Sequence, residues 1–293
     1  MTADLESAPT KTHRDENFPV ASQLIAARHR PIILAFYRFV RAADDIADNS
    51  ALTSAQKLTA LDRFEAALLG KEDDIEAAKP LRAMLAEHSL SPCHAQDLLH
   101  AFRMDAVKTR YANFDELMHY CAYSAAPVGR FVLDVHGESK STWPAADALC
   151  SALQIINHLQ DCAEDYHNLD RVYVPLDALQ REGIGVEALA EAKASPALLA
   201  CLHRLATRTE DLVRVGKELP RFVQDFRLCL ETTVIARLAQ VLVTGLRRHD
   251  PLSEKVHLSK PEFLAWTLVG IGEGFLQRSR RAGARVAISG KSA

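Results

Sequence analysis

Apolar residues recur at intervals of three and four along almost the whole chain, and convincing runs that alternate apolar with polar residues are absent. The first spacing places apolar side chains on one face of a helix, whereas strict alternation would indicate a strand. The pattern predicts helices over 19–28, 32–48, 54–69, 80–88, 93–108, 114–136, 144–168, 196–218, 221–247 and 260–282.

Proline and glycine mark the points where these helices begin or bend. Pro144 opens one of the longest helices, at a position where a missing amide hydrogen costs little. Pro127, followed by Gly129, predicts a kink near the middle of the helix at 114–136. The pattern is least regular over 170–195, where we expect short helices at most.

Composition supports one all-α domain. Hydrophobic residues make up 48% of the chain, glycine and proline number 12 each, and no linker rich in Gly, Pro or Ser interrupts it. We expect a folded domain over 16–282, between a disordered N-terminus at 1–15 and a flexible tail at 283–293.

Charge and cysteine content narrow the function and the compartment. A net charge of −3 gives no case for nucleic-acid binding. The six cysteines stand singly, which is typical of reduced core residues in a cytoplasmic protein. The polar N-terminus lacks the apolar core of a signal peptide, and no long uninterrupted apolar run predicts a membrane span. We therefore expect a cytoplasmic location.

Two aspartate pairs lie in strongly apolar helical stretches. Asp44 and Asp48 form the first aspartate pair, and Asp161 and Asp165 form the second. Residues four apart share one helix face, so each pair presents two carboxylates together. At 100° per residue, further polar side chains fall on the same stripes, each roughly 60° wide. These are Tyr37 and Arg41 beside the first pair, and Gln154 and Asn157 beside the second.

Solvent exposure, or attraction to a helix N-terminus, is the alternative explanation for these acids. It fits poorly, because both pairs come late in their predicted helices, where the helix dipole disfavours negative charge. Carboxylates on apolar helices are normally paired or bound to a cation. Mg²⁺ prefers carboxylate, water and phosphate oxygens. The two pairs therefore predict a magnesium-bound diphosphate, with Arg41 available to the remaining oxygens.

The chain resembles the squalene/phytoene synthase family over roughly 16–280. The resemblance is carried by YRFVRAADDIAD, YCAYSAAPVG and QIINHLQDCAEDYHNLDRVYVP. It implies an all-α isoprenoid-synthase helical bundle with a central cavity, and Mg²⁺ bound by Asp44, Asp48, Asp161 and Asp165. It further implies that diphosphate or the reacting prenyl chain contacts Tyr37, Arg41, Gln154, Asn157, Arg171 and Tyr173. It also implies that the cavity is lined by Phe18, Val128 and Gly129.

Within that family, ENFPVAS and SAAPVGR are most similar to a hopanoid-pathway branch that converts presqualene diphosphate to hydroxysqualene. Gln160 stands where condensing members usually have Arg, which removes one positive charge from the diphosphate site. Lys255 stands where an Arg is frequent. The loss of charge at Gln160 favours one diphosphate substrate over two. A plain surface position for Gln160 is the alternative.

The reaction outcome has several alternatives. The cation left by ionisation can be quenched by water or by hydride, and we expect water. GIGEG at 270–274 lacks the spacing and setting of a dinucleotide-binding loop, so NADPH is not expected. The alternatives are an NADPH-dependent squalene synthase, a synthase joining two prenyl diphosphates to presqualene diphosphate or phytoene, and a non-catalytic helical assembly factor.

Three further signals have modest explanations. The acidic run at 72–78 predicts a solvated loop. His158 and Cys162 share a helix face, but two ligands do not make a zinc site, so we expect core packing. The apolar and arginine-rich stretch at 263–285 predicts a core helix with a basic tail or, alternatively, a peripheral contact with an anionic membrane at its inner face. Expected partners are the prenyl diphosphate lipid and other enzymes of the same pathway.

Overall fold

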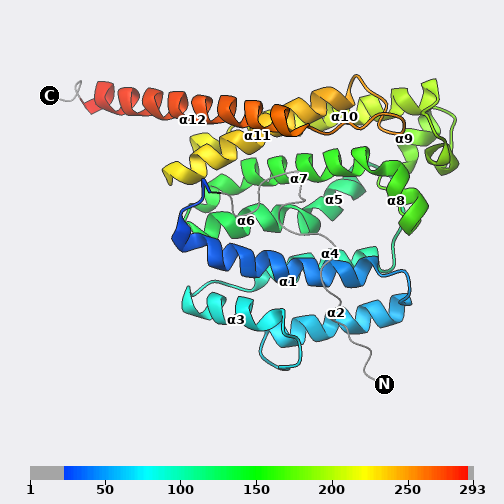
Figure 1. Ribbon diagram of the computed structural model, residues 1–293, viewed down its shortest axis with the longest axis horizontal. Coiled ribbons are helices and arrows are strands. Elements are labelled where there is room, and N and C mark those ends of the chain that lie inside the picture. The colour runs from blue at the N-terminus through cyan, green and yellow to red at the C-terminus, as the bar shows by residue number, and fades with distance from the viewer. Residues whose placement is uncertain (1–22, 290–293) are drawn as a thin grey trace.

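The computed structural model describes residues 23–289, which are helical apart from connecting loops and one isolated β-bridge between Arg110 and Val172 (Figure 1). The α-helices are α1 (Arg30–Asp48), α2 (Ser54–Leu68), α3 (Ala78–Glu87), α4 (Cys93–Asp105), α5 (Phe114–Ser124), α6 (Ala126–Val135), α7 (Trp143–Gln160), α8 (Cys162–Leu169), α9 (Leu176–Arg181), α10 (Pro196–Gly216), α11 (Phe226–Leu246) and α12 (Lys260–Ser289).

The helices are stacked around α7. Figure 1 shows α2 and α3 at one side, followed by α1 and α4, then α5 to α7, and finally α10 to α12 at the other side. Helix α7 packs against α5, α6, α10 and α11. One buried apolar cluster lies mainly among the first four helices, α1, α2, α3 and α4, and a second lies mainly among the helices from α5 through α11. Helix α11 is long and apolar enough to span a membrane, but most of it is buried in this core.

Several helices begin at the residues that local chemistry favours. Thr53 forms a capping box with Gln56 at the start of α2, in which each side chain bonds the backbone amide of the other. The side chains of Asn113, Ser195 and Asp225 cap α5, α10 and α11 in the same position. These polar residues fix where the apolar periodicity becomes a helix.

Two predicted helices are each divided in two. The helix expected over 114–136 breaks at Ala125, and Pro127 lies in the first turn of the second segment, α6. The predicted kink is therefore confirmed. The helix expected over 144–168 breaks at Asp161, whose backbone leaves the helical region (φ −102°, ψ 10°). This second bend was not predicted, because no proline or glycine marks it.

The two ends of the chain differ from the prediction. The helix expected over 19–28 is wrong in its described part, where a turn leads into a single 3₁₀ turn, Ala27–His29. Arg30 explains this, because its guanidinium donates to the carbonyls of Gln23 and Ile25 at 2.9 Å and holds the segment as a turn. At the other end α12 continues to Ser289, into the tail expected at 283–293. Residues 1–22 and 290–293 lie outside the described residues.

Candidate active site

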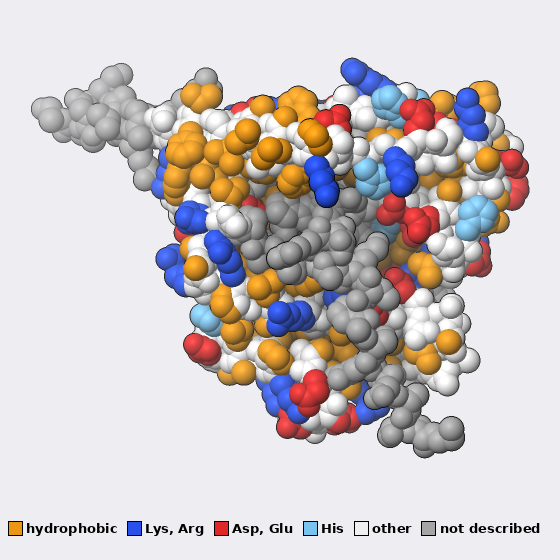
Figure 2. All heavy atoms as spheres, in the orientation of Figure 1, with side chains coloured by type: hydrophobic (Ala, Val, Ile, Leu, Met, Phe, Trp, Pro, Cys, Tyr) orange, Lys and Arg blue, Asp and Glu red, His pale blue; other side chains and the backbone are white. Residues whose placement is uncertain are grey.

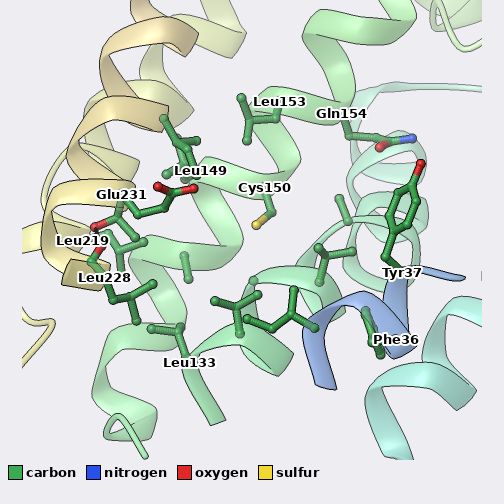
Figure 3. Close-up of a pocket in the computed structure, with 18 of the residues that line it drawn as sticks. Phe36, Tyr37, Leu133, Leu149, Cys150, Leu153, Gln154, Leu219, Leu228 and Glu231 are labelled. Atoms are coloured by element: carbon green, nitrogen blue, oxygen red, sulfur yellow. Dashed lines mark hydrogen bonds between the residues drawn. The ribbon is translucent and has the colours of Figure 1, made fainter. Parts of the chain in front are cut away.

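A cavity of about 290 Å³ lies between α1, α6, α7 and α11 (Figure 3). Its lining is mostly apolar and includes Phe36, Leu149 and Leu228. Figure 3 shows Tyr37 and Gln154 pointing toward one another at one side, with Glu231 at the opposite side. The polar lining residues are Tyr37, Ser124, Gln154, Asn157, Glu231 and Thr232.

The first aspartate pair lies at the C-terminal end of α1. Arg41 donates from Nη1 to Asp44 Oδ2 and from Nη2 to Asp45 Oδ1, both at 2.8 Å. Burial, together with the Asp48 carboxylate, raises the pKa of Asp44 to about 8, and Arg41 opposes the rise. Asp44 nevertheless keeps 29% of its side chain exposed, so a cation could reach it. The two carboxylates repel one another, and a cation bound between the protein and a ligand would relieve that repulsion.

The second aspartate pair lies where α7 becomes α8. The Asp165 amide still donates to the Asp161 carbonyl at 2.8 Å, so the two carboxylates remain one turn apart across the bend. Gln154 and Asn157 lie earlier on α7 and line the cavity. The second pair is therefore placed at the end of the cavity wall formed by α7.

A buried polar network connects the two pairs. Arg171 donates to Asp48 Oδ1 at 2.5 Å and to the Ala47 carbonyl at 2.9 Å. Arg171 also reaches the Asp105 carbonyl at 3.5 Å. Burial alone would lower the pKa of Arg171, but Tyr173, Asp105 and Asp48 raise it above its ordinary value. The Arg171 guanidinium therefore stays positively charged and is held against Asp48 of the first aspartate pair.

Asp105 anchors the middle of this network. It accepts hydrogen bonds from Tyr120 Oη at 2.7 Å and Tyr173 Oη at 3.1 Å. Burial raises the pKa of Asp105 to about 6, against the lowering effects of Arg171 and the tyrosine hydroxyls. Tyr173 in turn stacks on His158, whose Nδ1 lies 3.9 Å from Asp165 Oδ2. The chain of contacts therefore runs from the first pair to the second.

The loop that follows α8 places Arg171 and Tyr173 in the buried polar network. Helix α8 ends at Asp170, which adopts the left-handed conformation (φ 49°) that reverses the chain. The guanidinium of Arg110 holds Asp170 through its carboxylate and its carbonyl. The next residues then pass beside 109–111, where the Val172 amide donates to the Thr109 carbonyl.

The other residues expected at the site lie in different places. Gln160 is buried, and its Nε2 donates to the Val256 carbonyl, which brings the exposed Lys255 beside the end of α7. Val128 and Gly129 line the cavity, and Val128 is 41% exposed. Phe18 lies outside the described residues.

Three residues of the site were missed from the sequence. Asp105 and Tyr120 are separated by 15 positions from one another and lie in ordinary amphipathic helices, so no local spacing marks them. Glu231 is a buried carboxylate in the cavity wall, 2% exposed. The one signal for Glu231 was its position within the long apolar stretch of α11.

The donor set fits a cation that is shared with a ligand. No group of three or more His, Cys, Asp or Glu able to hold a metal by itself occurs within residues 23–289. Each aspartate pair instead offers two hard oxygen donors, with Arg41 and Arg171 nearby. Mg²⁺ commonly takes one or two protein carboxylates together with water and substrate phosphates, so the residues present suit that arrangement.

Comparison of the sequence with known proteins shows which family the chain matches. The family model described as squalene/phytoene synthase matches residues 11–262. Hydroxysqualene synthase from Rhodopseudomonas palustris is 53% identical over 279 residues, covering 95% of this chain and 96% of the relative. The enzyme of the same name from Sinorhizobium fredii is 53% identical over 282 residues, covering 96% of each.

Solved structures share the fold. Squalene synthase HpnC from Alicyclobacillus acidocaldarius has a TM-score of 0.70 and 29% identity, covering 78% of this chain and 87% of its own. A dehydrosqualene synthase with a bound ligand has a TM-score of 0.75 and 22% identity, covering 90% and 93%. The all-α isoprenoid-synthase architecture expected from the sequence is thereby confirmed.

Proposed function

The chain belongs to the squalene/phytoene synthase family, and we propose that it converts presqualene diphosphate to hydroxysqualene with release of diphosphate. The observation that carries the proposal is the identity of 53% with hydroxysqualene synthases over nearly the full length of both chains. The site is compatible with this chemistry, because carboxylate pairs and arginines adjoin an apolar cavity.

The two aspartate pairs are proposed to hold Mg²⁺, with Asp44 and Asp48 on one side of the diphosphate and Asp161 and Asp165 on the other. Bound Mg²⁺ would supply positive charge that stabilises the leaving diphosphate. Arg41 would help to bind its oxygens, and Arg171 keeps Asp48 oriented by a direct ion pair. These side chains thus favour ionisation of the C–O bond.

The cavity is proposed to hold the prenyl chains. Its apolar lining, including Phe36, Leu149 and Leu228, would exclude bulk water from the cation that ionisation leaves. Tyr37, Gln154 and Asn157 present polar groups on the walls formed by α1 and α7, and these groups would contact the reacting end. Val128 and Gly129 line the same cavity from α6, and Phe18 and Tyr173 complete the proposed set.

A single diphosphate substrate suits the end of α7. Gln160 is neutral there, and its amide is engaged with the Val256 carbonyl. The exposed Lys255 adjoins that contact and is proposed to approach the diphosphate. We accordingly expect no NADPH requirement and no condensation of two prenyl diphosphates.

The test is product analysis with purified protein, Mg²⁺ and either presqualene or farnesyl diphosphate, with and without NADPH, in H₂¹⁸O. We expect hydroxysqualene that carries ¹⁸O, from presqualene diphosphate alone. Squalene formed only when NADPH is present would contradict capture by water. Turnover of farnesyl diphosphate alone would contradict the role given to Gln160.

The catalytic domain is proposed to span 16–282. Other enzymes of the pathway are its proposed protein partners.

A membrane surface is the proposed lipid partner of this domain. Figure 2 shows hydrophobic side chains gathered along α12. Large apolar side chains of this helix are exposed: Leu264, Leu268, Val269, Phe275 and Leu276. After Glu273 the sequence contains five basic and no acidic residues: Arg278, Arg280, Arg281, Arg285 and Lys291. An apolar helix face with a basic end suits an anionic membrane at its inner, cytoplasmic surface.

A further inference from the structure

His158 lies between Gln154, which lines the cavity, and Asp165 of the second aspartate pair. It is 9% exposed, and its ring stacks on Tyr173 with centroids 3.5 Å apart and an interplanar angle of 15°. Its Nε2 lies 3.0 Å from Gln154 Nε2, and its Nδ1 lies 3.9 Å from Asp165 Oδ2. These contacts place the imidazole between the Gln154 carboxamide and the Asp165 carboxylate.

The contact with Gln154 fixes the orientation of its carboxamide. An amide nitrogen can only donate, so His158 Nε2 is the acceptor in this hydrogen bond. The carboxamide oxygen of Gln154 is then the group left for a ligand in the cavity that Gln154 lines. Stacking on Tyr173 and the Tyr173–Asp105 hydrogen bond hold the imidazole itself in place.

The position of Gln154 suits a water that attacks beside the diphosphate. The rearranged carbon that is captured lies within a few bonds of the carbon that has lost the diphosphate, so capture occurs in the part of the cavity nearest the aspartate pairs. Gln154 lies about two helical turns before Asp161 on α7. Glu231, the buried carboxylate of the lining, lies on α11 at the opposite side of the cavity (Figure 3). Gln154 is thus the better placed acceptor.

We propose that His158 is a positioning residue that orients the Gln154 carboxamide, whose oxygen accepts a hydrogen bond from the water that captures the cation. The inference rests on the proposed function. In the step, the C–O bond to diphosphate breaks and its electron pair leaves with the diphosphate. The cyclopropane ring of the substrate then rearranges to a new carbocation. The water oxygen forms the new C–O bond to the rearranged skeleton while a ring C–C bond breaks to give an alkene, and the proton that the water loses passes to the released diphosphate.

The predicted consequence is a change of product. With a less well oriented water, more of the cation would lose a proton to give a C30 hydrocarbon, and less alcohol would form. Release of diphosphate depends on the aspartate pairs and Arg41, and it would continue. A residue that only supported the fold would instead lower both products in parallel.

The experiment uses the full-length chain with presqualene diphosphate and Mg²⁺ in H₂¹⁸O, and measures diphosphate release and the ratio of alcohol to hydrocarbon by mass spectrometry. His158→Phe keeps a ring on Tyr173 and removes the acceptor. His158→Gln restores an acceptor at similar reach and removes the ring. His94→Phe is the matched control, because His94 is 3% exposed, contacts Phe131 and Trp143 and bonds Asp134 at 2.8 Å.

We expect His158→Phe to lower the ratio of alcohol to hydrocarbon by about tenfold, the upper end of what a single hydrogen bond typically contributes. His158→Gln should retain most of the alcohol, and His94→Phe should leave the ratio unchanged. If His158→Phe does not fold, Gln154→Met removes the same hydrogen bond from the other side and carries the same expectation.

Two results would overturn the inference. One is a wild-type product ratio in His158→Phe, and the other is an equal loss of alcohol in the Phe and Gln variants, which would assign the effect to the ring. Failure of the proposed function looks different, because the wild-type protein itself would then form no ¹⁸O-labelled alcohol.

Discussion

Asp44 is held beside a second carboxylate and partly out of water, so its charge is costly until a cation neutralises it. Asp44→Asn removes that charge with little change in volume. We expect kcat/KM to fall by at least about a hundredfold, a loss typical of deleting one charge-stabilising group. The melting temperature without metal should stay the same or rise. Kinetics across a range of Mg²⁺ concentrations provide the measurement.

Asp62→Asn is the matched control for this prediction. Asp62 is also a helical aspartate paired with an arginine, Arg103, but its side chain is 68% exposed on α2, away from the cavity. Its substitution should leave turnover unchanged. Activity of Asp44→Asn within twofold of the wild type would show that the first pair does not bind the metal, and would revive a non-catalytic role for the fold.

The raised pKa of Asp44 also predicts how stability depends on pH. Between its ordinary value of 3.8 and about 8, the folded state binds more protons than the unfolded state. The free energy of unfolding therefore falls as pH rises through this window. Thermal melts in EDTA from about pH 5 to about pH 8 should show the decline, and added Mg²⁺ should restore more stability at the upper end.

Asp44→Asn separates this contribution from that of Asp105, whose pKa is also raised, to about 6. The variant should retain a decline up to about pH 6 and flatten above it. A slope that is identical in the variant and the wild type up to pH 8 would show that Asp44 does not carry the effect.

Single residues were predictable where their partners lie on the same helix. The spacing predicts Arg41 beside the first aspartate pair, and Arg41 donates to Asp44 as well as to the neighbouring Asp45. Asp105 was not predictable, because its partners Tyr120 and Tyr173 come from other segments. Core packing was expected for His158, and its burial confirms this, but its contact with Gln154 depends on a rotamer that spacing does not specify.

At the scale of elements, α6 and α7 approach closely at Gly129. A Cβ atom built there would lie 2.6 Å from Cys150 Sγ, well inside contact distance. Overpacking at this position should cost about 1–3 kcal/mol, against a gain of about 1 kcal/mol in helix propensity. Gly129→Ala should therefore lower the free energy of unfolding by up to about 2 kcal/mol. Urea unfolding followed by circular dichroism measures the difference.

Two further variants test the cause. Cys150→Ala removes the opposing sulfur. Its effect on the free energy of unfolding should therefore be more favourable in the Gly129→Ala background than in the wild-type background. A double-mutant cycle measures this difference. Gly272→Ala on α12 is the matched control, because a Cβ there meets nothing within 4 Å. It should be neutral or stabilising. A destabilising effect of similar size at Gly272 would mean that the loss does not come from the α6–α7 contact.

Helix boundaries followed the sequence where proline or a capping side chain sets them. The start of α6 at Pro127 and of α2 at Thr53 are examples. The bend at Asp161 has no such residue, so no local feature of the sequence marks it. The turn at 23–26 depends on Arg30 bonding backward to two carbonyls, which apolar periodicity does not reveal.

For the whole molecule, periodicity predicted an all-α fold, and the family resemblance added the cavity. Neither could specify which helices enclose it, because this depends on contacts between segments distant in sequence. Helices α1 and α11 form facing parts of the lining, and α7 lies in the centre of the packing. Val40 on α1 and Asn157 on α7 line this cavity one turn before Asp44 and Asp161, so the packing of these helices sets where the two aspartate pairs lie relative to it.

The exposed face of α12 leads to a prediction about the molecule's surroundings. The wild-type protein should sediment with anionic phospholipid vesicles, and less so as salt concentration rises, because basic residues contribute to attraction. Replacing both Leu268 (61% exposed) and Phe275 (52%) with Glu should weaken binding by at least about tenfold. Turnover of dispersed substrate should remain, because none of the α12 side chains that the structure describes lines the cavity.

Val107→Glu is the control for added charge, because Val107 is 64% exposed next to the end of α4, on a different part of the molecule. It should bind vesicles like the wild type. Equal loss with Val107→Glu would mean that negative charge alone, and not the α12 face, weakens binding. The membrane assignment would be wrong if the wild type does not bind vesicles and sediments as a dimer, whereas the α12 variant sediments as a monomer. The apolar face would then bind a second copy of the chain.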